Sequence, residues 1–146
     1  KKKQQSPGED DKSILYNDLD TESSDIDKEY EINKQVFQKL DSLIRRDELY
    51  LSADLSREDL VRMAHMNNTR FAKMIKENTG TNLSGYINEL RLNHAIHLLK
   101  EHPEYTLRAI AEASGINSMP TFHSLFKNKT GMTPSEFKKT QMDMKQ

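Results

Sequence analysis

A motif of 17 residues occurs twice in this chain of 146 residues, and this internal repeat constrains the fold more than any other feature. The segment RFAKMIKENTGTNLSGY, residues 70–86, aligns without gaps with TFHSLFKNKTGMTPSEF, residues 121–137. The matched apolar and glycine positions are Phe71 with Phe122, Met74 with Leu125, Ile75 with Phe126, Gly80 with Gly131, and Tyr86 with Phe137. A chain that contains one unit twice is expected to build two similar substructures.

The residues upstream of each copy also align, with Leu60 opposite Ile110 and Met66 opposite Ile116. Each copy then consists of a short helix, a tight turn, and a second helix with a polar N-terminal face, which is the outline of a helix-turn-helix. The turn of the second copy contains Gly115, whereas the first has His65 at that position. Histidine tolerates a positive φ better than bulky residues do, so we expect a formed but slightly strained first turn.

Helical spacing of apolar residues and the absence of alternating strand patterns predict an all-α fold. The expected elements are a first motif at about 56–79, a linker helix at about 84–100, and a second motif at about 106–130. The residues expected to cap the helix starts are Ser56, Asn67 and Ser118, with Thr106 opening a further short helix. A linker helix of about 17 residues spans roughly 25 Å. Two motifs joined in this way suit successive major grooves, which open about 34 Å apart on one face of a duplex.

The N-terminal part of the chain differs in composition from the rest. Residues 1–25 are polar and acidic, which predicts a disordered linker. Residues 26–51 predict an amphipathic helix that packs on the following domain, with a dimer contact as the alternative. We assign residues 52–140 to the domain that holds both motifs and residues 141–146 to a frayed tail. Since the sequence starts KKKQQ without Met, we expect a piece of a longer protein, with an effector or sensor domain outside it.

Charge separates the two halves of the chain. Residues 1–54 hold nine Lys and Arg against fourteen Asp and Glu, and residues 55–146 hold thirteen against nine. The half with the repeat therefore carries the positive charge that contact with nucleic-acid phosphates requires.

The repeat resembles the AraC/XylS-type DNA-binding domain over about Leu51 to Lys139. The segment GINSMPTFHSLFKNKTGMTPSEFKK, residues 115–139, is very similar to the C-terminal signature of that family, and RLNHAIHLL, residues 91–99, is similar to its linker helix. The resemblance implies a seven-helix, homeodomain-like double helix-turn-helix domain whose third and sixth helices enter adjacent major grooves. It also implies transcription regulation, with double-stranded DNA as partner, RNA polymerase as a further partner, and the cytoplasm as location.

The base-facing residues are expected on the exposed first turns of each second helix. In the first motif these are Asn68, Thr69, Arg70, Ala72 and Lys73, and the resemblance implies the last four in particular. Arg70 or Lys73 can donate to both O6 and N7 of a guanine.

The second motif offers a different set. Its outward residues are Met119, Pro120, Thr121, His123 and Ser124. Met119 offers only apolar contact and Pro120 has no N–H, so the second helix is expected to add positioning more than specificity. The residues assigned to phosphate contacts in the two motifs are Asn67, Lys76, Ser118, Lys127 and Lys129.

Other classes of function are less well supported by the sequence. There is no cysteine, no phosphate-binding glycine loop and no recognisable nucleophile, so we expect no enzyme activity, no cofactor and no bound small molecule. His94 and His97 lack a converging third ligand, so we expect no metal site. Two alternatives stay open: a protein-interaction module that uses the N-terminal helix, and the cytoplasmic output domain of a membrane-bound sensor, for which KKK would be a juxtamembrane cluster.

Overall fold

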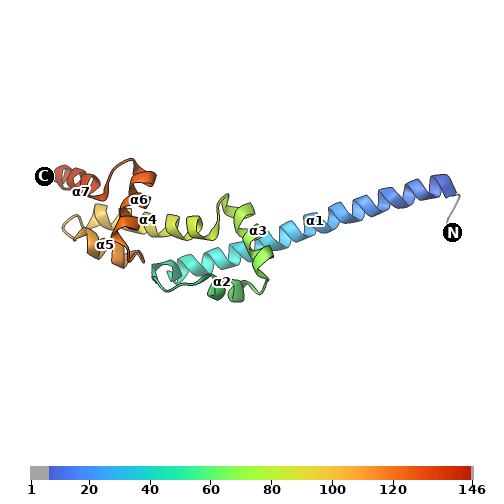
Figure 1. The fold of residues 1–146 in the computed structure, drawn as a ribbon, viewed down its shortest axis with the longest axis horizontal. Helices are drawn as coiled ribbons and strands as arrows, with labels where there is room; N and C mark the ends of the chain where they lie inside the picture. Colours follow the sequence, from blue (N-terminus) through green and yellow to red (C-terminus); the bar gives the residue numbers. More distant parts are fainter. Residues whose placement is uncertain (1–6, 146) are drawn as a thin grey trace.

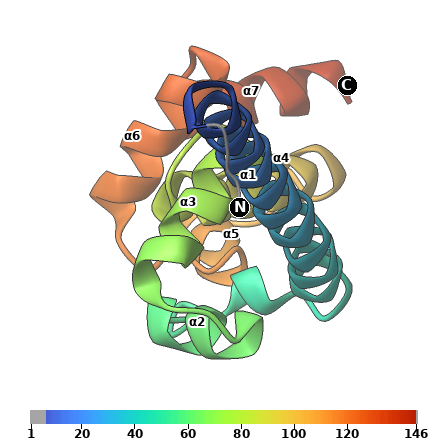
Figure 2. The same ribbon diagram turned by 90° about the vertical axis from the view of Figure 1, so that its right-hand side faces the viewer.

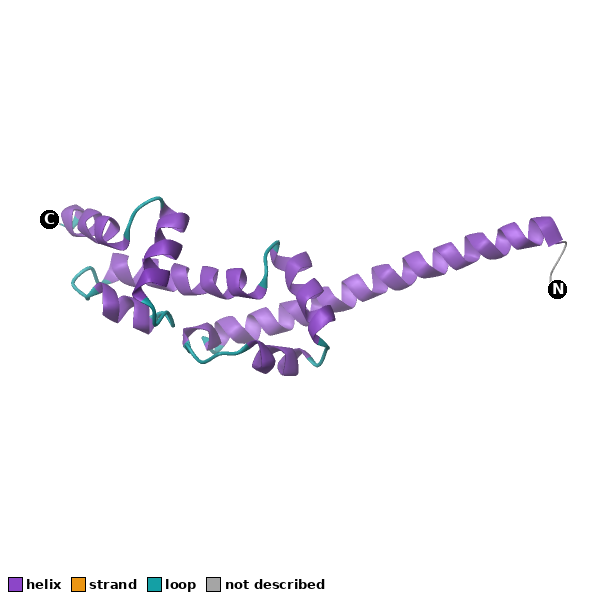
Figure 3. Ribbon diagram, in the orientation of Figure 1, coloured by secondary structure: helices purple, strands orange, loops and turns teal. Residues whose placement is uncertain are grey.

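A computed structural model describes residues 7–145, with side-chain surroundings from residue 24 onward, and this range is helical without strands (Figure 3). The elements in chain order are α1 (Pro7–Arg46), the 3-10 helix η1 (Leu49–Leu51), α2 (Arg57–Ala64), α3 (Asn68–Thr79), α4 (Leu83–Glu101), α5 (Leu107–Ala113), α6 (Met119–Thr130) and α7 (Pro134–Met144). The predicted all-α class is confirmed. The two motifs correspond to α2–α3 and α5–α6, and α4 is the linker helix between them.

The first helix differs from the prediction at both ends. It begins at Pro7, so it includes most of the predicted linker, whose residues 1–6 lie outside the described residues. No Pro or Gly follows Gly8 within α1, so nothing in the backbone interrupts the helix there. At the other end, Glu48 adopts a left-handed conformation at φ 52° and turns the chain into η1, which ends α1 before the predicted Leu51.

Only the C-terminal half of α1 packs on the rest of the protein. Figure 1 shows its N-terminal half extending away from the other helices, while the other half lies beside α2 and α3. Leu40 and Ile44 are buried there, whereas Ile26 and Tyr30 are 61% and 44% exposed. The amphipathic stripe therefore has a partner within this chain from about Asn33 onward.

Two separate hydrophobic cores stabilise the domain, one for each motif. The first contains Phe71, Met74 and Ile75 of α3, and the second contains Phe122 and Phe126 of α6. The linker helix contributes to both: its first half supplies Tyr86, Ile87 and Leu90 to the first core, and its second half supplies Leu92, Ala95 and Leu99 to the second. One continuous helix thus joins two cores that are otherwise distinct.

Local capping explains where the helices begin and end. The Ser56 side chain accepts from the Asp59 N–H and the Asp59 carboxylate accepts from the Ser56 N–H, which forms a capping box at the predicted cap of α2. Gly80 and Gly131, the glycines matched in the repeat, end α3 and α6 with positive φ. His65 ends α2 at φ 56°, so the predicted left-handed first turn is confirmed.

The two halves also meet beside the linker helix. Arg91 of α4 donates from Nε to the Tyr50 carbonyl at 2.7 Å and from its terminal nitrogen to the Ser52 carbonyl at 2.8 Å. Burial lowers the pKa of the Arg91 guanidinium. The Gly115 turn lies against the same loop. A Cβ at Gly115 would be 2.7 Å from the backbone carbonyl oxygen of Tyr50. These contacts join the second turn to the first half and fix how the two motifs are oriented.

Candidate nucleic-acid interface

The first two turns of α3 present most of the predicted base-facing residues to solvent. The Asn67 side chain accepts from the Arg70 N–H at 2.8 Å and holds the start of the helix. Phe71 and Met74 are fully buried, so the helix has one fixed orientation. The exposed residues on its outer face are Asn68, Thr69, Ala72 and Lys73. Polar side chains of this kind can form hydrogen bonds with the edges of bases.

Arg70 is placed differently from its neighbours. It is only half-exposed, and its Nε donates to Oδ1 of Asn33 on α1 at 2.8 Å. Asn33 is fully buried. The sequence shows no sign of this pair, because the two residues are 37 positions apart.

Arg57 is a further residue of this surface that the sequence did not indicate. Its Nε donates to Oδ1 of Asn68 at 3.2 Å and its terminal nitrogen donates to the Asn68 carbonyl at 3.3 Å. The guanidinium also lies 5.3 Å from the centre of the Phe71 ring. Arg57 thus links the start of α2 to the start of α3 and adds positive charge beside the candidate base-facing residues.

The first turn of α6 presents a less polar surface. Its exposed residues are Pro120, Thr121, His123 and Ser124. The Ser118 side chain accepts from the Thr121 N–H at 3.4 Å. Met119 was predicted to face outward, but it is half-buried and packs on the second core. A flexible thioether at the first position of the helix can fold over neighbouring apolar side chains, which accounts for this difference.

The lysines assigned to phosphate contacts have different surroundings. Lys127 on α6 is exposed. Lys129 pairs with Glu89 of α4, and Lys76 donates from Nζ to the Gly80 carbonyl at 3.1 Å at the end of α3. Lys76 and Lys129 therefore have hydrogen-bond or ion-pair partners within the protein.

The two second helices lie on the same flank of the molecule. Figure 2 shows α3 and α6 together on one side and the C-terminal half of α1 on the other. In Figure 1 both helices cross the direction of α4, which separates them along its length. Their exposed first turns are the surface that could meet one face of a duplex.

Contacts between α1 and α4 support the first motif on the side away from the exposed face of α3. The Tyr86 hydroxyl donates to the Asp41 carboxylate, and the rings of Tyr86 and Phe37 lie 5.5 Å apart. Burial, and then the bond to Asp41, raises the pKa of Tyr86. The tyrosine therefore stays protonated and can keep donating to Asp41 at physiological pH.

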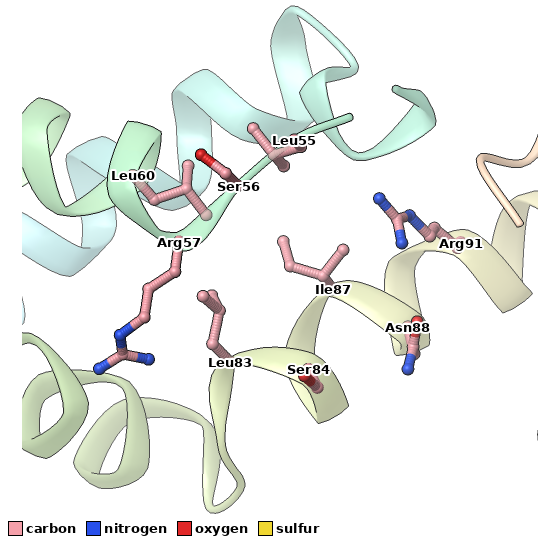
Figure 4. A pocket seen from close by; sticks show the side chains of 9 residues that line it. All are labelled: Leu55, Ser56, Arg57, Leu60, Leu83, Ser84, Ile87, Asn88 and Arg91. Atoms are coloured by element: carbon pink, nitrogen blue, oxygen red, sulfur yellow. The ribbon is translucent and has the colours of Figure 1, made fainter. Parts of the chain in front are cut away.

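A pocket of about 200 Å³ lies between the start of α2 and the linker helix (Figure 4). Leu55, Leu60 and Ile87 supply its apolar side, and Arg57 and Arg91 lie at its ends. The side chains that line it include no acid or histidine that could act as a general base.

The described part of the chain contains neither a metal-binding cluster nor a membrane-spanning helix. Among residues 24–145, whose side-chain surroundings are described, no three His, Asp or Glu side chains converge in a way that could hold a metal ion. No helix within residues 7–145 is long and apolar enough to cross a membrane.

Comparison with known proteins identifies the family. Residues 60–140 match the family model described as a helix-turn-helix domain. An uncharacterized transcriptional regulatory protein of Bacillus subtilis, YesN, is 39% identical over 80 residues, which cover 54% of this chain and 22% of YesN. The RCS-specific HTH-type transcriptional activator RclR of Escherichia coli is 31% identical over 81 residues, or 56% of this chain and 28% of RclR. The matches thus span less than a third of the length of either relative.

Solved structures agree with this result. A transcriptional regulator with an AraC-type DNA-binding domain from Chromobacterium violaceum superimposes with a TM-score of 0.63 at 27% identity, over 74% of this chain and 93% of that one. The fold is therefore that of a double helix-turn-helix DNA-binding domain. The chain belongs to the AraC-type helix-turn-helix family, whose members are DNA-binding transcription regulators and not enzymes.

Proposed function

We propose that α3 and α6 bind adjacent major grooves on one face of a DNA duplex. The observation that carries this proposal is that both helices lie on one flank of the protein and are joined by a continuous α4 that enters both cores. A rigid connection gives the two helices one separation, which is what two grooves about 34 Å apart require.

The two helices contribute unequally in this proposal. The first two turns of α3 carry Arg70 and Lys73, both able to donate to O6 and N7 of guanine. The exposed start of α6 carries Pro120, which has no donor, and Thr121, His123 and Ser124, none of which has the paired donors of an arginine. We assign most of the sequence specificity to α3, and to α6 a positioning role supported by the phosphate contacts of Lys127.

Selection of bound duplexes from a random pool tests the two-groove arrangement. We expect two short preferred sequences whose centres lie about 10–10.5 base pairs apart, with the stronger preference in one of them. A single preferred sequence the width of one groove would contradict the proposal. The dependence of Kd on salt should be steep, because basic side chains replace counterions on phosphates.

The matched residues cover only 22% of YesN and 28% of RclR, so both relatives contain regions beyond the domain that they share with this chain. We propose that a sensor or effector domain outside the chain controls access to DNA and that the bound protein contacts RNA polymerase. Expression of the domain alone, with a reporter under the selected site, tests this. Regulation that no longer responds to the inducing condition is the expected result, and a retained response would contradict an external control domain.

A further inference from the structure

Asn33 of α1 is a polar residue that is fully buried in an apolar contact between helices. Its side chain is fully buried where α1 meets α3, among positions that further along the helix are filled by apolar Phe37 and Leu40. Its Nδ2 has no hydrogen-bond partner in the part of the chain that the structure describes. A buried N–H without a partner is destabilising, so an apolar side chain would suit the packing better.

The other half of the same amide makes a specific contact. Oδ1 of Asn33 accepts from Nε of Arg70 at 2.8 Å. This bond uses Nε, the guanidinium nitrogen that links the aliphatic part of the side chain to the terminal group. It leaves the two terminal nitrogens, which form the fork that contacts O6 and N7 of a guanine.

If Arg70 is held in one rotamer before DNA binds, the entropic cost of forming its two hydrogen bonds to guanine is lower. We infer that Asn33 is a positioning residue for base recognition: it fixes Arg70 so that its terminal nitrogens face a guanine in the first groove. The inference rests on the proposed role of α3. It extends sequence specificity to α1, outside the helix-turn-helix motif.

A double-mutant cycle on the whole 146-residue chain tests the inference. The variants are Asn33→Leu, Arg70→Ala and the two combined, with exposed Gln35→Leu as the matched control on α1. Kd is measured for the selected duplex and for duplexes with each guanine of the first half-site replaced. We expect Asn33→Leu to weaken binding about tenfold on the duplex with the intact guanine and to have little effect where that guanine is replaced.

In the Arg70→Ala background, Asn33→Leu should cause no further loss, because the residue acts through Arg70. Asn33→Asp keeps the acceptor for Nε and should retain the guanine preference. Unfolding by denaturant should show Asn33→Leu to be as stable as the wild type or more stable, since the unpaired Nδ2 is removed. If Asn33→Leu fails to fold, Asn33→Ala provides the same comparison.

Three results would overturn the inference, and they separate it from the proposed function. If Arg70→Ala loses the guanine preference while the Asn33 variants keep it, only the positioning role fails. Equal losses from Asn33→Leu with and without Arg70 would show a purely structural role. If Arg70→Ala changes no base preference, Arg70 does not contact a base and the inference falls with it, while the two-groove arrangement still depends on the selection result.

Discussion

The two helix-turn-helix motifs both end their second helix at a glycine and bury a phenylalanine at the same position, yet they are supported in different ways. Behind α3 lies α1, which contributes the polar contacts of Asn33 and Asp41. Behind α6 lies α7, whose Phe137 packs edge-on against Phe126 at 5.4 Å. A polar support can orient a side chain that contacts a base, whereas an aromatic support only holds the helix in place. The comparison therefore matches the unequal roles proposed for the two helices.

The largest effect on the free energy of unfolding is expected from removing one phenylalanine from either hydrophobic core. Phe71 and Phe122 occupy equivalent positions and are both fully buried. Replacing either with Ala should lower the free energy of unfolding by about 3–5 kcal/mol. Hydrogen exchange should show Phe71→Ala increasing exchange mainly in α2 and α3, and Phe122→Ala mainly in α5 and α6. The same increase across both motifs from either variant would show one undivided core.

A smaller effect compares two glycines that both have positive φ. Gly115 has φ 84° and lies against the Tyr50 and Leu51 carbonyls, whereas Gly131 has φ 80° and open space where a Cβ would be. Gly115→Ala should cost about 2–4 kcal/mol, because strain and overlap both act. The control Gly131→Ala should cost about 1–2 kcal/mol. Equal decreases in the free energy of unfolding of the two variants would mean that the loop at Tyr50 can move to accommodate a Cβ at Gly115.

Base recognition gives the next comparison. Lys73 on α3 and Ser124 on α6 are equivalent exposed positions, and His123 precedes the latter. Lys73→Ala should cost about 1–3 kcal/mol of binding on the selected duplex and relax the preference at one position. His123→Ala should cost less and affect all sequences alike. Titrations against the selected duplex and its single-base variants measure both, and a larger, base-specific loss from His123→Ala would reverse the assigned roles.

The smallest effect concerns the two turns. His65 has φ 56° where the second motif has Gly115, and its side chain is exposed. His65→Gly should raise the free energy of unfolding by about 1 kcal/mol, because glycine adopts this conformation without strain. Thermal unfolding of the variant beside the wild type checks this. An unchanged or lower midpoint would mean that the His65 side chain makes a compensating contact.

The sequence predicted those features that depend on neighbouring residues. The caps at Ser56 and Asn67 follow from the side chains of these two residues, and the equivalence of Gly80 and Gly131 follows from the repeat. Burial of Phe71 and Phe122 follows from helical spacing. These signals were sufficient for the fold and for the surface that contains most candidate contacts.

The features that the sequence could not predict depend on residues far apart in the chain. The contact of Asn33 with Arg70 and that of Gly115 with Tyr50 leave no periodic pattern. The helical start of α1 was missed because its polar composition resembles that of a linker, while its lack of Pro and Gly permits a helix. Met119 was misplaced because spacing places a residue on a face but does not show how its flexible side chain folds.

The single α4 that enters both cores has a consequence for how such a regulator can change its target. For the two-groove binding proposed above, substitutions on the outer face of α3 or α6 alter which bases are preferred in one half-site. The distance between half-sites is set separately, by the length of α4 and its contacts with the loop at Tyr50 and Ser52. Sequence preference and spacing can therefore evolve independently, so a new binding site can arise without a change in its overall length.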